Sequence, residues 1–386
     1  MIPKIVTRDF LLIFFAQLVF TSSFFALMPT IPIYLSRLGA GEAEIGVLVG
    51  VLIVTSLITR PFVGRALLRI QERKFLIAGS FVTAFCCVAY LIAKPFFPFF
   101  ILRAIQGIGF AFFVTAGFTL AVNITPVAHH GEGISYFYIA GNLATALAPA
   151  FGILIINHFN FTALFLVCAA LSLASLSLTL RLGKRQGVPV EAQAAKHQPI
   201  LSREALPASI MGLISNNIWG SLNAFYPLFA LSHGVSNPGL FFTVFAAILV
   251  LGRAFGGKIL DLYRRERIIP PCLATQIIAM TTLAFSTTHP KFLLAAAIWG
   301  IGNVFLYPLM MAIAVDRAGT SRGPAIATFT ALNDLGTGMG SVIMGIVVQW
   351  TSYRTMFLTL AFTSVVNLFY FNLFVKEKGA KRDAHL

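Results

Sequence analysis

Charged residues are scarce in this chain of 386 residues. Only 11% are Asp, Glu, Lys or Arg, whereas 58% are hydrophobic and the mean hydropathy is +0.86. Soluble domains have about 45–50% apolar and about 25% charged residues, so the composition excludes a soluble enzyme and a disordered protein. Twelve spanning helices of about 20–25 residues would occupy most of this length. The composition therefore predicts an all-α membrane protein.

Cysteine and metal-binding patterns are also rare. The four cysteines lie in apolar runs, and the seven histidines are scattered without an HExxH pattern. These features exclude a disulfide scaffold, and they predict free thiols, no metal site and no bound cofactor. The first apolar run continues past Met28 without a cleavage site typical of a secretory signal. We therefore expect this run to remain as the first helix.

Acidic residues are rarer than basic ones: the chain has 13 Asp and Glu and 28 Lys and Arg, which gives a net charge of +15. In a soluble chain this balance would suggest a nucleic-acid partner. With both termini in the cytoplasm, however, the outer loops carry only four basic residues, Arg37, Lys94, Lys291 and Arg354. That asymmetry follows the positive-inside rule. We therefore expect an integral plasma-membrane protein, in a bacterium the inner membrane, surrounded by lipid and with no nucleic acid bound.

Apolar windows between charged or Pro/Gly breaks predict twelve helices. Their ranges are 10–35, 43–66, 74–93, 97–122, 131–157, 162–182, 206–232, 237–261, 267–288, 291–315, 322–350 and 354–375. The one long polar stretch, residues 183–205, separates the sixth helix from the seventh. The expected organisation is a six-helix bundle over 1–182, a cytoplasmic linker over 183–205 and a second six-helix bundle over 206–386.

An internal repeat supports this division. The run Arg60-Pro-Phe-Val-Gly64 recurs as Arg253-Ala-Phe-Gly-Gly257. At the same offset, half the chain length, Ala104-Ile-Gln-Gly-Ile-Gly109 recurs as Ala297-Ile-Trp-Gly-Ile-Gly302, and Gly46 matches Gly239. The alternative is chance similarity between two Gly-rich membrane sequences.

Two parallel six-helix repeats joined by an inner loop are the ground plan of major facilitator transporters. The chain resembles that superfamily along its whole length. The resemblance implies two pseudo-symmetric bundles around a central cavity, with a substrate site near the midplane and transport by alternating access. No nucleophile–base set, metal cluster or Gly-rich phosphate loop points to an enzyme.

The loop after the second helix resembles the family's G-x-L-A-D-R-x-G-R-K motif. Gly64, Arg69 and Arg73 match it, while Leu68 stands where the family has Asp. The resemblance implies that these residues latch the cytoplasmic gate, and that the lost Asp weakens one latch. The alternative is simple anchoring of basic residues at the inner surface. The matching residues of the second copy are Gly257, Asp261 and Arg265.

Two further motifs connect the chain with proton-coupled members of the family. Arg103 opens an R-x-x-Q-G-x-G pattern in the fourth helix, which implies that it tunes the protonation of a nearby carboxylate. The alternative is an arginine that snorkels to the membrane surface. In the fifth helix, Pro149 and Gly152 resemble a motif of drug–proton antiporters, although Ala144 and Ala148 replace its glycines. That motif favours export.

Asp334 is the leading candidate for proton coupling. The run from Thr328 to Val348 contains no other charge, so this carboxylate should lie within the bilayer, where a charge costs at least about 2.5–3.5 kcal/mol. It should therefore face the bundle interior and exchange protons, with the proton gradient as the energy source. The alternative is a structural acid paired with an arginine or capped by Asn333.

Polar and aromatic residues in the helices that line the cavity of such transporters are candidates for substrate binding, and helix–helix hydrogen bonding is the alternative for each. We expect neither a carboxylate cluster for a polyvalent cation nor a mid-membrane Arg or Lys pair for a dicarboxylate or phosphate ester. The 38 phenylalanines suit an apolar or amphipathic organic solute. The candidates are Gln17, Ser22, Asn142, Asn216, Asn217, Asn223, Tyr226, Trp299, Asn303 and Tyr307.

The leading hypothesis is a monomeric secondary transporter that exports a small organic compound in exchange for protons. Uptake by proton symport of a sugar, organic acid or siderophore-like solute is the second hypothesis. A non-transporting membrane sensor or scaffold is the third. The sequence leaves open the substrate, the direction of transport, the choice between protons and sodium, and the oligomeric state.

Overall fold

The computed structural model describes residues 7–126, 130–183, 201–262, 265–319 and 322–376. Within these residues the chain forms twelve α-helices, a short π-helical segment and no strand. The all-α fold expected from the composition is confirmed.

The twelve helices follow the order expected from the apolar windows. The N-terminal half contains α1 (Arg8–Arg37), α2 (Glu42–Ala66), α3 (Glu72–Ala89), α4 (Phe97–Ile124), α5 (His130–His158) and α6 (Phe161–Leu180). The C-terminal half contains α7 (Leu206–Ser232), α8 (Leu240–Leu262), α9 (Arg265–Ala284), α10 (His289–Arg317), α11 (Arg322–Trp350) and α12 (Tyr353–Tyr370), which the π-helical segment Phe371–Val375 extends.

Nine of the described stretches are long and apolar enough to cross a membrane. The other three lie in α3, α7 and α8. Helix α3 has only 18 residues, and its first turn contains Glu72, Arg73 and Lys74. These three charges lower its hydropathy without changing its place in the bundle, where it packs against α4 and α6.

Capping side chains and prolines determine where several helices begin. Thr7, Asn160 and Ser352 precede α1, α6 and α12, and each side chain accepts a hydrogen bond from the backbone N–H three residues later. Such caps satisfy N–H groups that a helix start leaves unpaired. In α4, α7 and α10 a proline occupies the first turn, where its missing N–H removes no intrahelical bond.

Repeated glycines pack the helices of each half in the same way. A Cβ atom on Gly107 of α4 would clash with the backbone carbonyl of Leu52 of α2. A Cβ atom on Gly300 of α10 would lie 2.9 Å from side-chain atoms of Ile248 of α8. Small residues allow helices in membranes to approach this closely. The fourth helix of each half therefore packs against the second helix of that half through the same repeat position.

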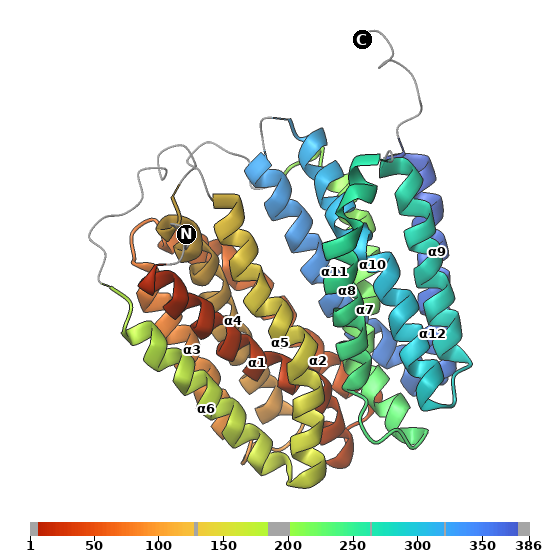
Figure 1. The fold of residues 1–386 in the computed structure, drawn as a ribbon. Helices are drawn as coiled ribbons and strands as arrows, with labels where there is room; N and C mark the ends of the chain where they lie inside the picture. Colours follow the sequence, from red (N-terminus) through yellow and green to blue (C-terminus); the bar gives the residue numbers. More distant parts are fainter. Residues whose placement is uncertain (1–6, 127–129, 184–200, 263–264, 320–321, 377–386) are drawn as a thin grey trace.

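The molecule has two distinct ends. We call the end at which α1 begins and α6 ends the linker end, and the opposite end the far end. Because the helices alternate in direction, odd-numbered helices run from the linker end to the far end and even-numbered helices run back (Figure 1).

The apolar core is shared at the far end and divided at the linker end. One cluster of buried residues at the far end takes in both halves, including Leu35 and Phe241. At the linker end, a cluster of the N-terminal half around Leu76 is separate from a cluster of the C-terminal half around Phe329. Apolar packing therefore joins the halves at one end only.

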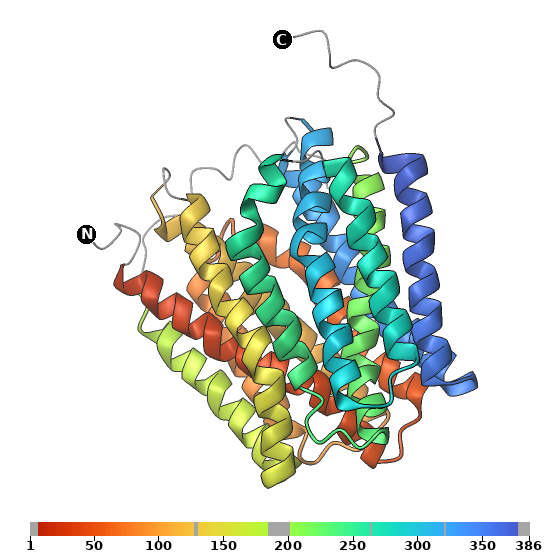
Figure 2. The same cartoon turned by 45° about the vertical axis from the view of Figure 1, so that its right-hand side comes forward.

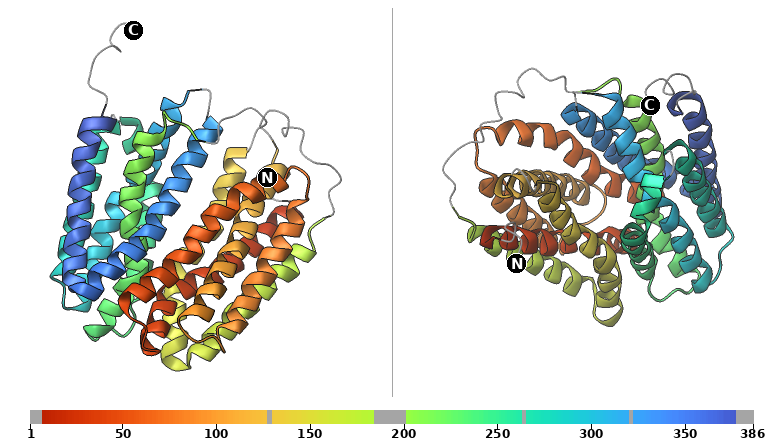
Figure 3. Two further views of the ribbon diagram at one scale, coloured as in Figure 1. Left: turned by 180° about the vertical axis from the view of Figure 1, so that it is seen from behind. Right: turned by 45° about the horizontal axis from the view of Figure 1, so that its top comes forward.

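The ribbon views agree with this division of the core. The two halves meet at the far end and diverge toward the linker end (Figures 1 and 3). Figure 2 shows α5 and α8, which belong to opposite halves, side by side. On the other side of the molecule α2 packs against α11.

Candidate functional site

Helix α7 of the C-terminal half contacts α1 and α2 of the N-terminal half. The two helix pairs with the most extensive contacts between the halves are α2 with α11 and α5 with α8. Each pair makes a hydrogen bond near the far end. In the first pair the backbone N–H of Ala43 donates to Gln349 Oε1 at 3.0 Å. In the second pair the Thr243 hydroxyl donates to the carbonyl of Ala146 at 2.7 Å. The far end is therefore closed by polar as well as apolar contacts.

Two glycines that match in the repeat lie at these closures. A Cβ atom on Gly239 would lie 2.5 Å from the Cα atom of Ala150 and 2.6 Å from the carbonyl oxygen of Pro149. A Cβ atom on Gly46 would clash with the carbonyl oxygen of Ser341. Pro149, part of the motif found in the fifth helix, thus lies at the contact between the halves.

One ion pair crosses between the halves deeper in the molecule. Arg60 Nη1 of α2 contacts Asp334 Oδ2 of α11. The two side chains are 29% and 30% exposed. Because a charge inside a bilayer is costly, each partner reduces the cost of the other. Within the described residues, this is the only hydrogen bond recorded between the halves that does not lie at the far end.

Two tyrosines lie within electrostatic range of this ion pair, and a second arginine lies within range of one of them. Tyr138 of α5 and Tyr307 of α10 are within electrostatic range of Arg60 and Asp334 and of each other. Arg253 of α8 lies within range of Tyr307. Tyr138 and Tyr307 are 54% and 37% exposed. We call these five residues, drawn from five helices of both halves, the central cluster.

The absence of a mid-membrane pair of basic residues stays a prediction, although Arg60 and Arg253 both lie within helices. They are also the first residues of the two repeated runs. In the structure Arg60 pairs with Asp334 of the opposite half.

Several predicted substrate-binding residues bond to their own helix. Ser22, Asn216, Asn223 and Asn303 each donate to a backbone carbonyl four residues earlier, at 2.7–3.0 Å. Such bonds satisfy a polar side chain within one helix. Asn216 also donates to Asn333 Oδ1, so it links α7 to the residue before Asp334. These residues are structurally satisfied without a ligand.

Three predicted residues are buried within the C-terminal half. Trp299 is 2% exposed, stacks on Phe245 at 4.1 Å and lies 5.6 Å from the Trp219 ring. Tyr226 is fully buried and Asn223 is 2% exposed. In this conformation they pack the interior of that half, and the Tyr226 hydroxyl and Trp299 Nε1 have no hydrogen-bond partner within the described residues.

Three further predicted residues, Asn142, Asn217 and Gln17, differ in burial and in hydrogen bonding from those above. Asn142 and Asn217 are half-buried, and Asn217 Oδ1 has no hydrogen-bond partner within the described residues. Gln17 is 5% exposed, its Oε1 is likewise unpaired, and it lies 3.7 to 3.9 Å from Cβ positions built on Gly117 and Gly141. Gln17 therefore lies between α1, α4 and α5.

Arg103 is buried, so it does not snorkel to the surface. It is 2% exposed, and it donates to the carbonyl of Leu48 and to Gln106 Oε1, both at 2.9 Å. Leu48 and Arg60 are more than three turns apart on α2, which corresponds to about 18 Å along the helix axis. Arg103 therefore does not pair directly with Asp334, and its predicted role in proton coupling would have to act over that distance.

The predicted gate residues whose side chains the structure describes do not link the halves in this conformation. Gly64 and Arg69 are exposed, and no atom lies within 4 Å of a Cβ position on Gly64. Arg73 donates to the carbonyls of Thr179 and Leu180 within the N-terminal half. Arg265 pairs with Asp316 within the C-terminal half. The side-chain surroundings of Gly257 and Asp261 lie outside the described residues.

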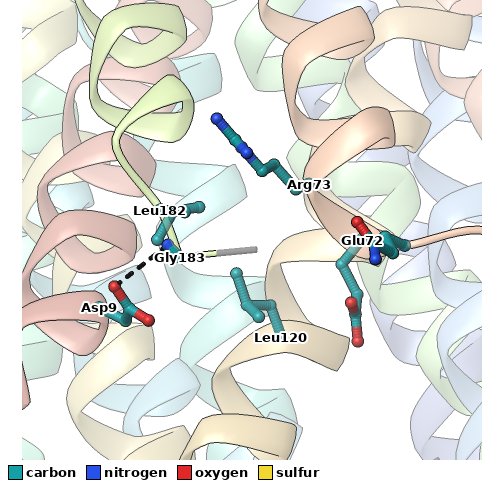
Figure 4. A pocket seen from close by; sticks show the side chains of 7 residues that line it. Asp9, Glu72, Arg73, Leu120, Leu182 and Gly183 are labelled. Atoms are coloured by element: carbon teal, nitrogen blue, oxygen red, sulfur yellow. Dashed lines mark hydrogen bonds between the residues drawn. The ribbon is translucent and has the colours of Figure 1, made fainter. Parts of the chain in front are cut away.

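A small cavity of about 20 Å³ lies at the linker end of the N-terminal half. Its lining includes Asp9, Glu72, Arg73 and Gly183 (Figure 4). The N–H of Gly183 donates to Asp9 Oδ1 at 3.5 Å. This volume holds about one water molecule, so the cavity is too small for an organic substrate.

At the start of the C-terminal half, Glu204 lies just before α7. Hydrogen bonds from its own backbone N–H and from the Ser202 hydroxyl lower the pKa of the Glu204 carboxyl below its ordinary value. The charge on Glu204 is therefore retained at neutral pH.

Comparison with known proteins identifies the family. The model of the Major Facilitator Superfamily matches residues 13–319 and again 208–386. The chain belongs to the major facilitator superfamily. It is a transmembrane transport protein of this superfamily rather than an enzyme, and its substrate is a small molecule.

Relatives and solved structures agree with this assignment. The chain is 23% identical over 374 residues to the staphylopine export protein of Staphylococcus aureus, covering 92% of this chain and 94% of that one. It is 22% identical over 381 residues to multidrug resistance protein MdtG of Enterobacter lignolyticus, covering 93% and 90%. A crystal structure of a mutant of the nucleoside transporter NupG has the same fold, with a TM-score of 0.80 at 16% identity, covering 95% of this chain and all of that one. Relatives of this superfamily member thus include exporters.

Sequence reasoning found Asp334 but missed its partner. Arg60 was visible as the first residue of a repeated run, and it is the one charged residue between Glu44 and Arg65 of α2. Applied to Arg60, the argument that singled out Asp334 would have marked it as a second membrane charge in need of a partner. Tyr138 gave no comparable signal, because an isolated tyrosine in an apolar helix is compatible with packing or with lipid contact.

Proposed function

We propose that this protein exports a small organic compound in exchange for protons, by alternating access of a site between its two halves. The observation that carries the proposal is the Arg60–Asp334 pair. It is formed by side chains of both halves, and both remain about one-third exposed. Rocking one half against the other changes the separation of these two charges, so the protonation state of Asp334 is coupled to the conformation.

Protonation acts on this pair in a defined sense. An ionised Asp334 attracts Arg60, whereas a protonated Asp334 is neutral and leaves Arg60 without a charge partner. The pair is formed in the present conformation, in which the halves diverge toward the linker end (Figure 1). We call this the linker-open conformation, and the ionised carboxylate stabilises it. A proton bound to Asp334 during the other half of the cycle would be released when the pair forms again.

The charge distribution supports the orientation of this cycle. At the far end the loops and the adjoining helix ends carry only four of the chain's 28 Lys and Arg residues, namely Arg37, Lys94, Lys291 and Arg354. The positive-inside rule then places the linker end and both termini in the cytoplasm. The present conformation would then be open to the cytoplasm and able to accept a substrate for export. In this proposal the transporter is a monomer in the plasma membrane.

The names of the relatives support export over uptake. One is a staphylopine export protein and others are multidrug resistance proteins. Proton symport of a solute into the cell remains the competing function, and the direction of substrate-driven proton movement separates the two.

The test uses everted vesicles energised acid-inside, with a pH-sensitive dye in the lumen. Lipophilic cations, antibiotics, sugars and metallophore-like compounds are added in turn to wild type, Asp334→Asn and Asp316→Asn. Export predicts that a substrate releases lumenal protons, and that Asp334→Asn reduces this release at least about tenfold because its link to Arg60 no longer depends on charge. Asp316→Asn is the matched control, since its arginine lies in the same half and the pair is exposed, so we expect a change within about twofold.

Two results would count against the proposal. Equal proton release by wild type and Asp334→Asn would remove Asp334 from the coupling mechanism. If no compound moves protons in wild type, proton-coupled export of these compound classes is wrong.

A further inference from the structure

The contacts between the halves show which positions of α5 and α11 are equivalent. The Cβ position of Gly46 lies against the carbonyl oxygen of Ser341, and the Cβ position of its repeat partner Gly239 lies against the carbonyl oxygen of Pro149. Pro149 of α5 is therefore equivalent to Ser341 of α11, and other positions of the two helices are matched by the same difference in residue number. This difference relates Ala146, which accepts the Thr243 bond, to Gly338, whose carbonyl lies 2.8 Å from a Cβ position on Gly50.

Extended toward the linker end, this alignment places Asn142 at the position equivalent to Asp334. The flanking residues agree, because Leu143 and Thr145 correspond to Leu335 and Thr337. The residue equivalent to Arg60 is Arg253. The two pseudo-symmetric interfaces thus differ in one charge: α2 and α11 present an arginine and a carboxylate, whereas α8 and α5 present an arginine and a neutral amide.

Arg253 has no acidic partner within the described residues. The ion pairs among these residues join Arg60 with Asp334 and Arg265 with Asp316. Arg253 is exposed, and the charged or titratable group in its electrostatic range is the Tyr307 hydroxyl. Because Asp334 compensates Arg60, the central cluster carries one uncompensated positive charge, located at Arg253.

We propose that Arg253 binds a carboxylate of the transported compound, with Asn142 and Tyr307 as neighbouring polar groups, so that the substrate is an anionic or zwitterionic organic acid. The proposal rests on the proposed function, because it requires a substrate between the halves. A guanidinium within a helix that none of the described acidic residues neutralises is suited to an incoming anion. A single uncompensated charge fits a monoanionic carboxylate better than a dianionic phosphate ester.

The test measures equilibrium binding without a proton gradient, so it is independent of proton coupling and of the direction of transport. Purified full-length protein in detergent is titrated with a panel of aromatic and aliphatic carboxylates. Each carboxylate is matched by its amide, its ammonium analogue and its phosphate ester, and thermal stabilisation of the protein reports binding. We expect carboxylates to bind wild type at least about tenfold more tightly than their amides, as a charge-assisted hydrogen bond allows.

Four variants locate the effect. Arg253→Gln should abolish the preference for the carboxylate over the amide, while Arg253→Lys should retain part of it. Asn142→Asp should abolish the preference as well, because it supplies the acid that the α5–α8 interface lacks. Asn142→Gln keeps a neutral amide and should retain the preference, which separates charge from side-chain size.

Several outcomes would overturn the inference. These are equal binding of carboxylates and amides to wild type, tighter binding of the ammonium or phosphate analogues, a carboxylate preference that survives in Arg253→Gln, and no stabilisation by any carboxylate of the panel. Because all of them are binding results, they leave the proton-release test of Asp334 unaffected.

Discussion

Arg60 and Arg253 occupy the same position in two copies of one repeat, yet their surroundings differ. Arg60 pairs with Asp334 across the interface between the halves, while the position equivalent to Asp334 in the other interface is Asn142. The same scaffold therefore holds one arginine that Asp334 neutralises and one that has no acidic partner in the described part of the chain.

This difference shows how a symmetric scaffold can hold two separate functions. The two interfaces share glycine contacts and hydrogen bonds at the far end, so both can open and close together. Toward the linker end the interfaces differ in charge. In our account the neutralised arginine responds to protons and the free arginine responds to substrate.

The largest expected effect is on proton release when Arg60 and Arg253 are substituted in turn. Arg60→Gln leaves Asp334 as a membrane carboxylate without its partner, so we expect substrate-induced proton release to fall at least about tenfold. Arg60→Lys should restore part of it because the charge returns. Arg253→Gln should instead raise the carboxylate concentration that gives half-maximal proton release, while release at saturating carboxylate persists because the Arg60–Asp334 pair is intact. Measurement of proton release in everted vesicles checks all three, and identical losses in Arg60→Gln and Arg253→Gln would contradict the distinction.

A smaller effect, on the closure of the far end, should follow from substituting the glycines that both interfaces contain. Gly46→Val and Gly239→Val each place a side chain against backbone of the opposite half, so both should shift the population away from the far-end-closed conformation by several-fold. Distances between spin labels placed across the far end should lengthen in both variants. Gly64→Val is the matched control, because no atom lies within 4 Å of its Cβ position. If only one of the two glycine variants opens the far end, the interfaces do not act as equivalents.

Much of the fold could be predicted from the sequence. Apolar windows located the twelve helices because a bilayer demands long apolar segments. The repeat located equivalent positions such as Gly107 and Gly300, which pack the fourth helix of each half on its second. Asp334 was recognisable because it is the one charge in a long apolar run.

The site itself could be predicted only in part. The partner of Asp334 is 274 residues away in sequence, and only the packing of α2 against α11 brings Arg60 to it. Helical periodicity also cannot tell a polar side chain that bonds to its own preceding turn, as in Asn223 and Asn303, from one that faces a cavity. For this reason amides and aromatic residues were weaker guides to the site than charges.

The most direct test of the central claim measures the distance between the halves at the linker end as a function of pH. Spin labels are attached to Leu68→Cys and Arg203→Cys, which are exposed positions of opposite halves, in a background without the four native cysteines. Our account predicts that the long-distance, linker-open population of wild type grows as the pH rises, since an ionised Asp334 can pair with Arg60. It predicts that this dependence is lost in Asp334→Asn and kept in Asp316→Asn. A distance distribution that responds to pH equally in wild type and Asp334→Asn would contradict the claim that this ion pair couples protonation to conformation.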